Sequence, residues 1–126
     1  MKSENILHDK SKAFAIRIVK LYKYLTTNDN PCLREFVLSK QILRSGTSIG
    51  ANTRESRRAQ SNADFIMKLH IAFKEAEETA YWLEILHATE YITDAMFESL
   101  NNDCEELIKL LSSIIKSSKQ CSPLNS

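Results

Sequence analysis

The chain has 126 residues, of which 43% are apolar and 26% charged, and its formal net charge is +1. These proportions are those of one globular domain and exclude a disordered chain. No apolar run reaches the roughly 18–20 residues needed to cross a bilayer, and the first residues lack the apolar stretch of a secretion signal. We therefore expect a cytoplasmic protein that does not enter a membrane.

The turn-forming residues and the cysteines narrow the fold class further. Two glycines and two prolines leave few places to turn, which favours a handful of long helices. Cys32, Cys104 and Cys121 lie far apart and form no C-x-x-C pair. Neither a disulfide framework nor a zinc site is expected from this spacing. Cys104 falls on the apolar face of a predicted helix and is interpreted as a small buried hydrophobic residue.

Charge is distributed unevenly along the chain. Residues 1–25 and 32–62 each carry six Lys or Arg against two acids, whereas residues 63–115 carry three against eleven. Two interpretations are open. The basic and acidic segments attract one another inside an antiparallel bundle, or one face stays basic and binds a polyanion.

The first helix is predicted over residues 9–27. Its apolar residues, spaced by four, three and four positions, share one helical face: Phe14, Ile18, Leu21 and Leu25. The polar run TTNDNP ends this helix. Asn30 before Pro31 is typical of an N-cap followed by proline at the first helical position, so a second helix is predicted to start there.

The second helix is unusual because its core-facing positions become small and polar. We predict the following seam: Leu38, Ile42, Ser45, Ile49, Asn52 and Ser56. Gly46 and Gly50 stand four residues apart on a neighbouring face, and small residues at that spacing let another helix approach closely. Each glycine costs about 1 kcal/mol of helix propensity, so we expect close packing or a bend there.

A polar ladder follows one side of the same helix. Arg44, Ser48, Asn52 and Glu55 lie close to the i, i+4 spacing that places residues on one face. Such a ladder fixes helix register if it is a buried hydrogen-bonded network. It binds a partner if it is an exposed polar surface, and both interpretations stay open.

The third and fourth helices carry the most regular apolar patterns. Ser61 followed by Asp64 predicts a capped start of the third helix. Its seam has strict four-three spacing over roughly 40 Å of helix: Phe65, Leu69, Ala72, Ala76, Thr79, Leu83 and Leu86. The fourth helix is predicted to start near Thr93-Asp94, with Leu100, Cys104, Leu107, Leu111 and Ile114 on one line. The tail from about Ser117 is polar and expected to fray.

Four helices with short connections predict an all-α fold, an antiparallel up-down-up-down four-helix bundle that forms one domain over residues 1–126. The last two helices carry more apolar residues than one core uses: Ile66, Phe73, Tyr81, Trp82, Ile85, Ile108 and Ile115. A second apolar face of this kind indicates a homo-oligomer with these residues at its interface. The alternative is a thicker core within one chain.

The second helix also carries a family resemblance. The run Gln41-x-x-Arg44-Ser45-x-x-Ser48-Ile49-x-Ala51-Asn52-x-x-Glu55 resembles the signature of small bacterial four-helix bundle proteins, the 23S rRNA intervening-sequence proteins. The resemblance continues through Asp64-Phe65, Glu78 and Leu107, so it covers nearly the whole chain. It departs from the family pattern at Thr53, where an apolar residue is common, and at Gly50, where proline is common.

Assembly and partners follow as expectations from this resemblance. It implies a homopentamer with a central channel and a polar network that joins Glu78 to Arg44, Ser48, Asn52 and Glu55. It also implies kinship with the accessory variability protein of diversity-generating retroelements, which associates with a reverse transcriptase and binds nucleic acid.

The best functional candidate is a basic stripe on the second helix. Arg54, Arg57 and Arg58 crowd the end of that helix, and Lys40 and Arg44 extend the stripe. Arginine forks suit phosphates, and cations suit the negative end of a helix dipole. The segment ESRRAQSN offers no aromatic residue for base stacking, so we expect RNA or DNA binding with little sequence specificity. The alternative is that these arginines pair with the acidic third helix.

An enzymatic reading finds little support. Glu84-x-x-His87 is the unit that di-iron bundles use twice, and it occurs once here. The sequence holds no P-loop and no G-x-S-x-G motif. We expect no catalysis, no metal and no cofactor. Two function classes remain, a nucleic-acid-binding accessory protein and a structural scaffold, and neutralisation of the basic stripe by Glu75, Glu77, Glu78 or Glu84 would favour the scaffold.

Overall fold

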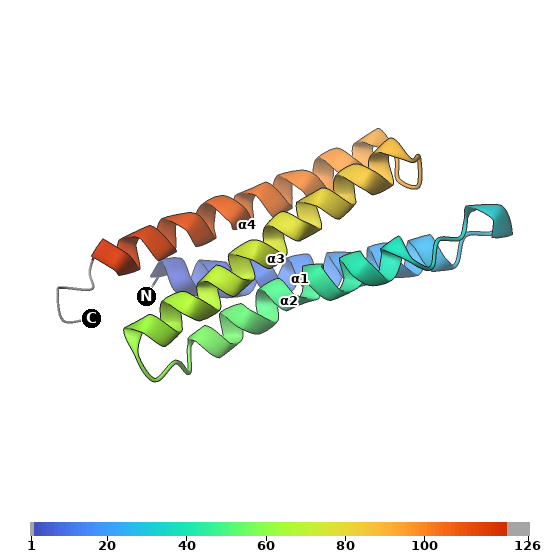
Figure 1. The fold of residues 1–126 in the computed structure, drawn as a ribbon. Coiled ribbons are helices and arrows are strands. Elements are labelled where there is room, and N and C mark those ends of the chain that lie inside the picture. Colours follow the sequence, from blue (N-terminus) through green and yellow to red (C-terminus); the bar gives the residue numbers. More distant parts are fainter. Residues whose placement is uncertain (1, 121–126) are drawn as a thin grey trace.

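The predicted four-helix bundle is confirmed by a computed structural model, which describes residues 2–120. Its helices are α1 (Lys2–Thr26), α2 (Leu38–Ser56), α3 (Asn62–Ala88) and α4 (Asp94–Gln120). Consecutive helices run antiparallel, and α4 returns to lie beside α1, as Figure 1 shows. The described residues contain no β-strand.

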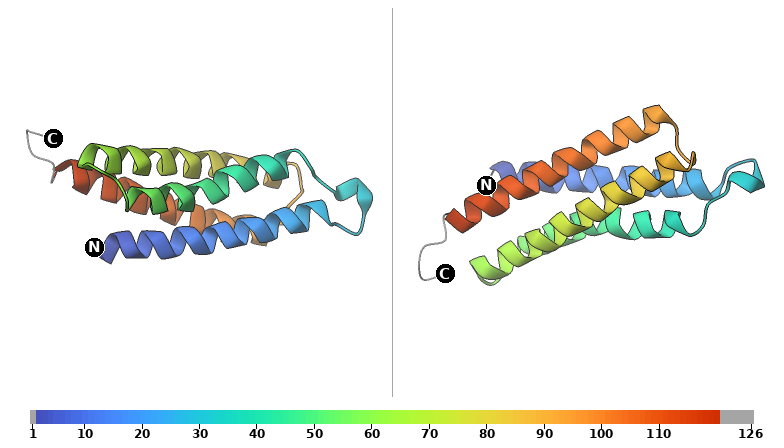
Figure 2. Two further views of the ribbon diagram at one scale, coloured as in Figure 1. Left: turned by 90° about the horizontal axis from the view of Figure 1, so that it is seen from below. Right: turned by 45° about the horizontal axis from the view of Figure 1, so that its top comes forward.

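The two ends of the bundle differ in what they display. The start of α1, the α2–α3 connection and the end of α4 lie together at one end (Figure 2). The α1–α2 and α3–α4 connections lie at the opposite end, and the α1–α2 connection projects beyond the helices. Within residues 2–120, no helix combines the length and apolar character that a bilayer crossing requires.

The core follows the predicted seams closely in α1, α3 and α4. Every predicted seam residue of these helices is buried except Phe65, which is half-buried and packs against the core. Cys104 is buried as expected, and its thiol donates a hydrogen bond to the carbonyl oxygen of Ala76 at 3.2 Å. Ser61 caps α3 as predicted, because its hydroxyl oxygen accepts a hydrogen bond from the N–H of Asp64 at 3.1 Å.

Four of the six predicted seam residues of α2 are buried, namely Ile42, Ser45, Ile49 and Ser56, and the buried side of the helix also includes residues outside the predicted seam. Thr53 is buried, whereas the predicted Asn52 is only half-buried and its amide donates to the carbonyl oxygen of Ser48. Gly46, seven residues before Thr53, is also buried and lies against Ile18 of α1. Because Gly46 has no side chain, α1 approaches α2 on this side. The line through positions 46 and 53 therefore enters the core.

The start of α2 also differs from the prediction. Asn30 does cap a helical turn at Pro31, but that turn is a short 3₁₀ helix, Pro31–Leu33. The α-helix begins only at Leu38. The reason is Glu35, a buried residue whose carboxylate accepts hydrogen bonds from the N–H groups of Val37 and Ser39. This carboxylate satisfies N–H groups that the first turn of a helix leaves unpaired.

Two helix ends extend beyond the predicted boundaries. α1 begins at Lys2, seven residues before the predicted start, and adds Leu7 to the core. α4 continues through Ser117 to Gln120, so the fraying expected from Ser117 is not seen over these residues. Cys121 and the residues after it lie outside the described part of the chain.

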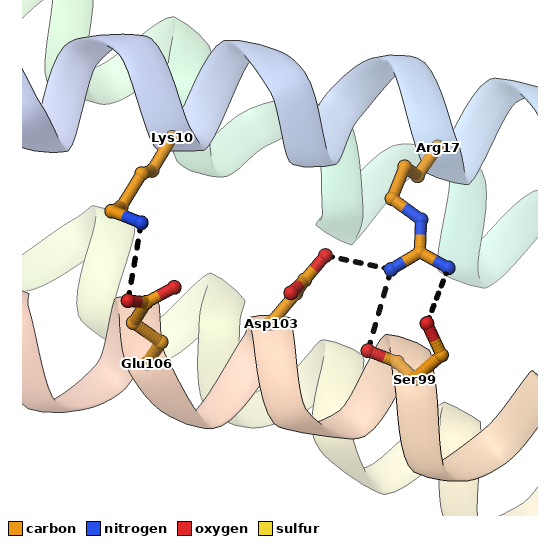
Figure 3. Close-up of polar contacts among 5 residues, drawn as sticks. All are labelled: Lys10, Arg17, Ser99, Asp103 and Glu106. Atoms are coloured by element: carbon orange, nitrogen blue, oxygen red, sulfur yellow. Dashed lines mark hydrogen bonds and ion pairs between the residues drawn. The ribbon is translucent and has the colours of Figure 1, made fainter.

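Opposite charges join α1 to α4, as the first interpretation of the charge pattern requires (Figure 3). Arg17 donates to a carboxylate oxygen of Asp103 at 2.6 Å and to the Ser99 hydroxyl at 2.8 Å. Lys10 pairs with Glu106 at 3.1 Å. Because these pairs are partly exposed, each contributes at most about 1 kcal/mol to stability. They do, however, pair two cations of α1, Lys10 and Arg17, with acids of the same chain.

Candidate nucleic-acid interface

The predicted basic stripe lies on the outside of α2. We use the term α2 basic face for Lys40, Arg44, Arg54, Arg57 and Arg58, all of which are exposed. At 3.6 residues per turn, Lys40, Arg44 and Arg54 point away from the core-facing Ile42 and Ile49, and Arg57 and Arg58 follow directly after α2 ends at Ser56. Arg57 lies nearer α1 and donates a hydrogen bond to the side-chain oxygen of Asn5 at 2.8 Å.

Within residues 2–120, no acidic side chain forms an ion pair with the α2 basic face. In the part of the chain that the structure describes, the lysine and arginine ion pairs are Lys10–Glu106, Arg17–Asp103 and Lys68–Glu55. None of these includes a residue of the α2 basic face. The alternative in which these arginines pair with α3 therefore finds no ion pair to support it.

Arg44 comes closest to such neutralisation. Burial raises the pKa of the Glu75 carboxyl on α3, the negative charge of Glu78 raises it further, and the positive charge of Arg44 lowers it. Arg44 and Glu75 thus interact through space without forming an ion pair. This electrostatic interaction places Arg44 on the side of the face nearer α3, whereas Arg54 and Arg58 lie nearer α1.

A groove between α1 and α2 adjoins these two arginines. Its volume is about 420 Å³. Arg54 lines it from α2, Arg58 from the turn that follows α2, and His8 and Lys12 from α1. The two α1 residues were not singled out from the sequence, where nothing indicated which side of the first helix faces the arginines. Glu55 also lines the groove, but it pairs with Lys68 at 3.5 Å.

The predicted polar network does not form as one connected unit. The Ser48 hydroxyl donates to the carbonyl oxygen of Arg44, and the Asn52 amide donates to that of Ser48, both within α2. Glu55 pairs with Lys68, while Glu78 accepts from the indole N–H of Trp82. The ladder is therefore a set of separate contacts, two within α2 and one between Glu55 of α2 and Lys68 of α3. Because Arg44, Glu55 and Glu78 are exposed, the interpretation as a buried network is wrong.

The polar contact that does cross the core was missed. The Thr79 hydroxyl of α3 donates to the Ser45 hydroxyl of α2 at 2.8 Å, and both residues are fully buried. Both residues belong to the predicted core seams. The sequence feature that could have indicated this contact is therefore a hydroxyl residue in each of two facing apolar stripes. This bond favours one placement of α2 against α3, because sliding either helix would break it and leave each hydroxyl with only the carbonyl of its own helix, Glu75 at 2.8 Å for Thr79 and Ile42 at 3.5 Å for Ser45.

Comparisons with known proteins agree with this architecture. The 23S rRNA-intervening sequence protein family matches residues 3–113, which include most of all four helices. The chain belongs to this family.

A solved structure supports the same assignment. It is a protein of unknown function from the S23 ribosomal protein family of Bacteroides thetaiotaomicron, 62% identical to this chain. The match covers 90% of this chain and 98% of that one, with a TM-score of 0.86. No curated protein matches the chain.

The apolar residues expected at an oligomer interface of this 23S rRNA-intervening sequence protein divide into three groups. Tyr81 is 54% exposed and its ring meets Trp82 edge-on at 5.2 Å. The half-buried group packs against the core, apart from Ile85: Ile66, Phe73, Trp82, Ile85 and Ile108. Ile115 is only 6% exposed because it packs into the core of its own bundle. The prediction that it is available to a second copy is therefore wrong.

Two exposed residues of α3 were missed as interface candidates. Met67 is 60% exposed, and Ile71, one turn later, is also exposed. Helical geometry places both on the outward side of α3 together with Tyr81. The signal was present in the sequence, since both lie opposite the Leu69 and Ala72 seam.

The residues of the E-x-x-H unit have separate surroundings in this family member. Glu84 is exposed on α3. The Nε2 atom of His87 lies 2.7 Å from a carboxylate oxygen of Asp94, and its ring stacks on Phe97 at 4.2 Å. Among residues 2–120, no three His, Cys, Asp or Glu side chains are grouped as a metal site requires.

Proposed function

We propose that this 23S rRNA-intervening sequence protein is a non-enzymatic, homo-oligomeric protein that binds RNA or DNA in the cytoplasm through the α2 basic face. The observation that carries the proposal is the contrast between neighbouring helices. Lys10 and Arg17 of α1 are paired with acids of α4, whereas the arginines at the end of α2 have no ion pair in the described chain. Unpaired cations concentrated on one face attract a polyanion.

The chemistry of the face favours phosphate over base recognition. Arg54, Arg57 and Arg58 present planar donor groups that match phosphate oxygens. They also crowd the C-terminal end of α2, so the backbone itself adds no positive field there and the side chains must supply the attraction. Among the described residues, no phenylalanine, tyrosine or tryptophan lines the adjoining groove, and its one aromatic ring is the imidazole of His8. Binding should therefore be sensitive to salt and largely independent of base sequence.

Oligomerisation would multiply this effect. The family resemblance implies a homopentamer, in which five copies of the basic face sum to a stronger field than one copy provides. Met67, Ile71 and Tyr81 supply exposed apolar area on α3 for such a contact. The same kinship makes a reverse transcriptase a candidate protein partner in addition to RNA or DNA.

The test is a salt titration of RNA and DNA binding by electrophoretic mobility shift. Replacing Arg54, Arg57 and Arg58 together by Gln should abolish binding at physiological salt. A matched control replaces Lys20, Lys23 and Lys109 by Gln, three exposed lysines without ion pairs in the described chain, and removes the same charge. Equal losses in both variants, or no loss in the arginine variant, would refute the α2 basic face as the binding surface.

The second candidate function is a structural scaffold whose partner is another protein. The exposed α3 residues Met67, Ile71 and Tyr81 favour it, because apolar groups on one outer face commonly mark a protein contact. Light scattering at micromolar concentration distinguishes the outcomes for self-association. A stable oligomer that the Tyr81→Glu substitution dissociates supports the α3 contact, whereas a monomer contradicts the homo-oligomer in either proposal.

A further inference from the structure

The α1–α2 groove carries an inference that deepens the proposed nucleic-acid binding and rests on it. We propose that the groove seats the phosphodiester backbone of one nucleic-acid strand, and that Lys12 and His8 of α1 form the second wall of the site. In this arrangement the backbone lies between two helices and not on the outer surface of α2 alone.

The first observation is the convergence of cations that have no counter-ion. Lys12, Arg54 and Arg58 all line the groove, and none of them forms an ion pair within residues 2–120. Like charges held on facing walls repel one another, which is unfavourable unless an anion occupies the space between them. The one acid at the groove, Glu55, is held at its edge by Lys68 of α3.

The second observation is that small residues are part of the lining. Ala15 and Gly50, which are half-buried, and the exposed Ala51 line the groove together with the cationic side chains. A Cβ atom placed on Gly50 would lie 3.4 Å from the carbonyl oxygen of Ser11, so the two helices are close together at this point. Short side chains above a close helix contact leave a hollow in which a sugar and its phosphates can lie against apolar groups.

The dimensions of the groove suit more than one phosphate. On α2 it extends from Thr47 to the end of the helix at Ser56, roughly 14 Å along the helix axis at about 1.5 Å per residue, and Arg58 lines it from the turn that follows. Successive phosphates on one strand of a duplex rise by about 3.4 Å, so several phosphates face this length. Because a free strand and one strand of a duplex share this backbone, both are ligands of the proposed class.

Charge removal provides the first arm of the test. Binding of labelled single-stranded RNA and of the corresponding duplex is measured by fluorescence anisotropy across a salt series. The Lys12→Gln variant should weaken binding roughly three- to tenfold and lower the log–log salt slope by about 0.7–0.9, the value for one phosphate contact. The control is Lys20→Gln, an exposed lysine of α1 that lies at a different depression beside Arg17 and Tyr24, and it should leave the slope unchanged.

Filling the groove without changing charge provides the second arm. The Ala51→Leu variant places a larger side chain in the lining of the groove and should reduce affinity on the order of tenfold, since the nucleic-acid backbone loses part of its space. The control, Ala13→Leu, makes the same change at an exposed position of α1 outside the groove and should have no effect. Circular dichroism and urea unfolding show whether each variant remains folded, and both positions are exposed enough to tolerate leucine.

The outcomes separate this inference from the proposed function. The inference holds if Lys12→Gln and Ala51→Leu impair binding of either RNA form while their controls do not. It is overturned if both variants match their controls although the triple arginine variant no longer binds, because the strand would then lie on the outer face of α2. If the triple arginine variant binds like the wild type, the proposed function fails and the groove proposal fails with it.

Discussion

Gly46 of α2 lies directly against Ile18 of α1. A Cβ atom added to Gly46 would come within 2.7 Å of Cγ1 and 2.9 Å of Cγ2 of Ile18, distances that real Cβ atoms do not adopt. Ile18 is completely buried and branched at Cβ, so it has few alternative rotamers with which to move away. The contact therefore sets the distance between the first two helices, and with it the position of the groove farther along them.

This contact predicts opposite results for the two glycines of α2. Gly46→Ala should lower the free energy of unfolding by up to about 2 kcal/mol, because overpacking of about 1–3 kcal/mol outweighs the gain of about 1 kcal/mol in helix propensity. At Gly50 an added Cβ meets only an ordinary contact with the Ser11 backbone, so Gly50→Ala should be neutral or stabilise by up to about 1 kcal/mol. Urea unfolding of the two variants checks the prediction, and a Gly46→Ala variant as stable as Gly50→Ala would contradict it.

The helices were predictable where apolar residues alone determine the burial. In α3 and α4 the four-three spacing runs through long apolar seams, and the structure buries those seams almost completely. The start of α2 was not predictable in this way. Asn30-Pro31 does begin a helical turn, but whether a turn propagates depends on tertiary contacts. Glu35 is part of such a contact, since its N–H donates to the carbonyl oxygen of Leu25 while its carboxylate caps α2.

The candidate site was predictable on one helix and not on its neighbour. The cluster of Arg54, Arg57 and Arg58 is evident from the sequence because its members are adjacent. His8 and Lys12 are more than forty residues away along the chain. Their place beside the arginines depends on the rotation and axial position of α1 against α2, which the contact between Gly46 and Ile18 determines. A helical periodicity gives the buried face of each helix but not this relative placement.

We predict that the buried thiol of Cys104 makes the protein less stable in alkaline solution. Burial, with smaller contributions from the carboxylates of Glu105 and Asp103, raises the pKa of this thiol from 9.0 to about 12. Above pH 9 the unfolded thiol loses its proton while the folded thiol keeps it, so the unfolded state binds fewer protons. Stability should therefore fall as the pH rises from about 9 toward 12, by up to about 1.4 kcal/mol per pH unit from this group.

Comparison with two cysteine variants isolates the contribution of Cys104. Urea unfolding at several pH values above 8 should give a shallower decline for Cys104→Ala than for the wild type, although that variant is the less stable of the two near pH 8. Cys32→Ala, which changes an exposed thiol, should keep the wild-type decline. An unchanged decline in Cys104→Ala would mean that other groups cause the alkaline loss.

We predict that replacing Glu90, just after the end of α3, by glycine stabilises the protein. Its φ angle is 67°, in the left-handed region that glycine adopts without steric penalty. The surrounding hydrogen bonds are those of a Schellman motif, since the N–H of Tyr91 donates to Leu86 and the N–H of Glu90 donates to His87. Glu90→Gly should raise the free energy of unfolding by about 0.5–1 kcal/mol, because relief of the left-handed strain exceeds the added entropy of the unfolded chain. Glu90→Ala removes the same charge but retains Cβ, so it should leave stability nearly unchanged. Equal stabilisation by alanine and glycine in urea unfolding would show that charge, and not backbone conformation, is responsible.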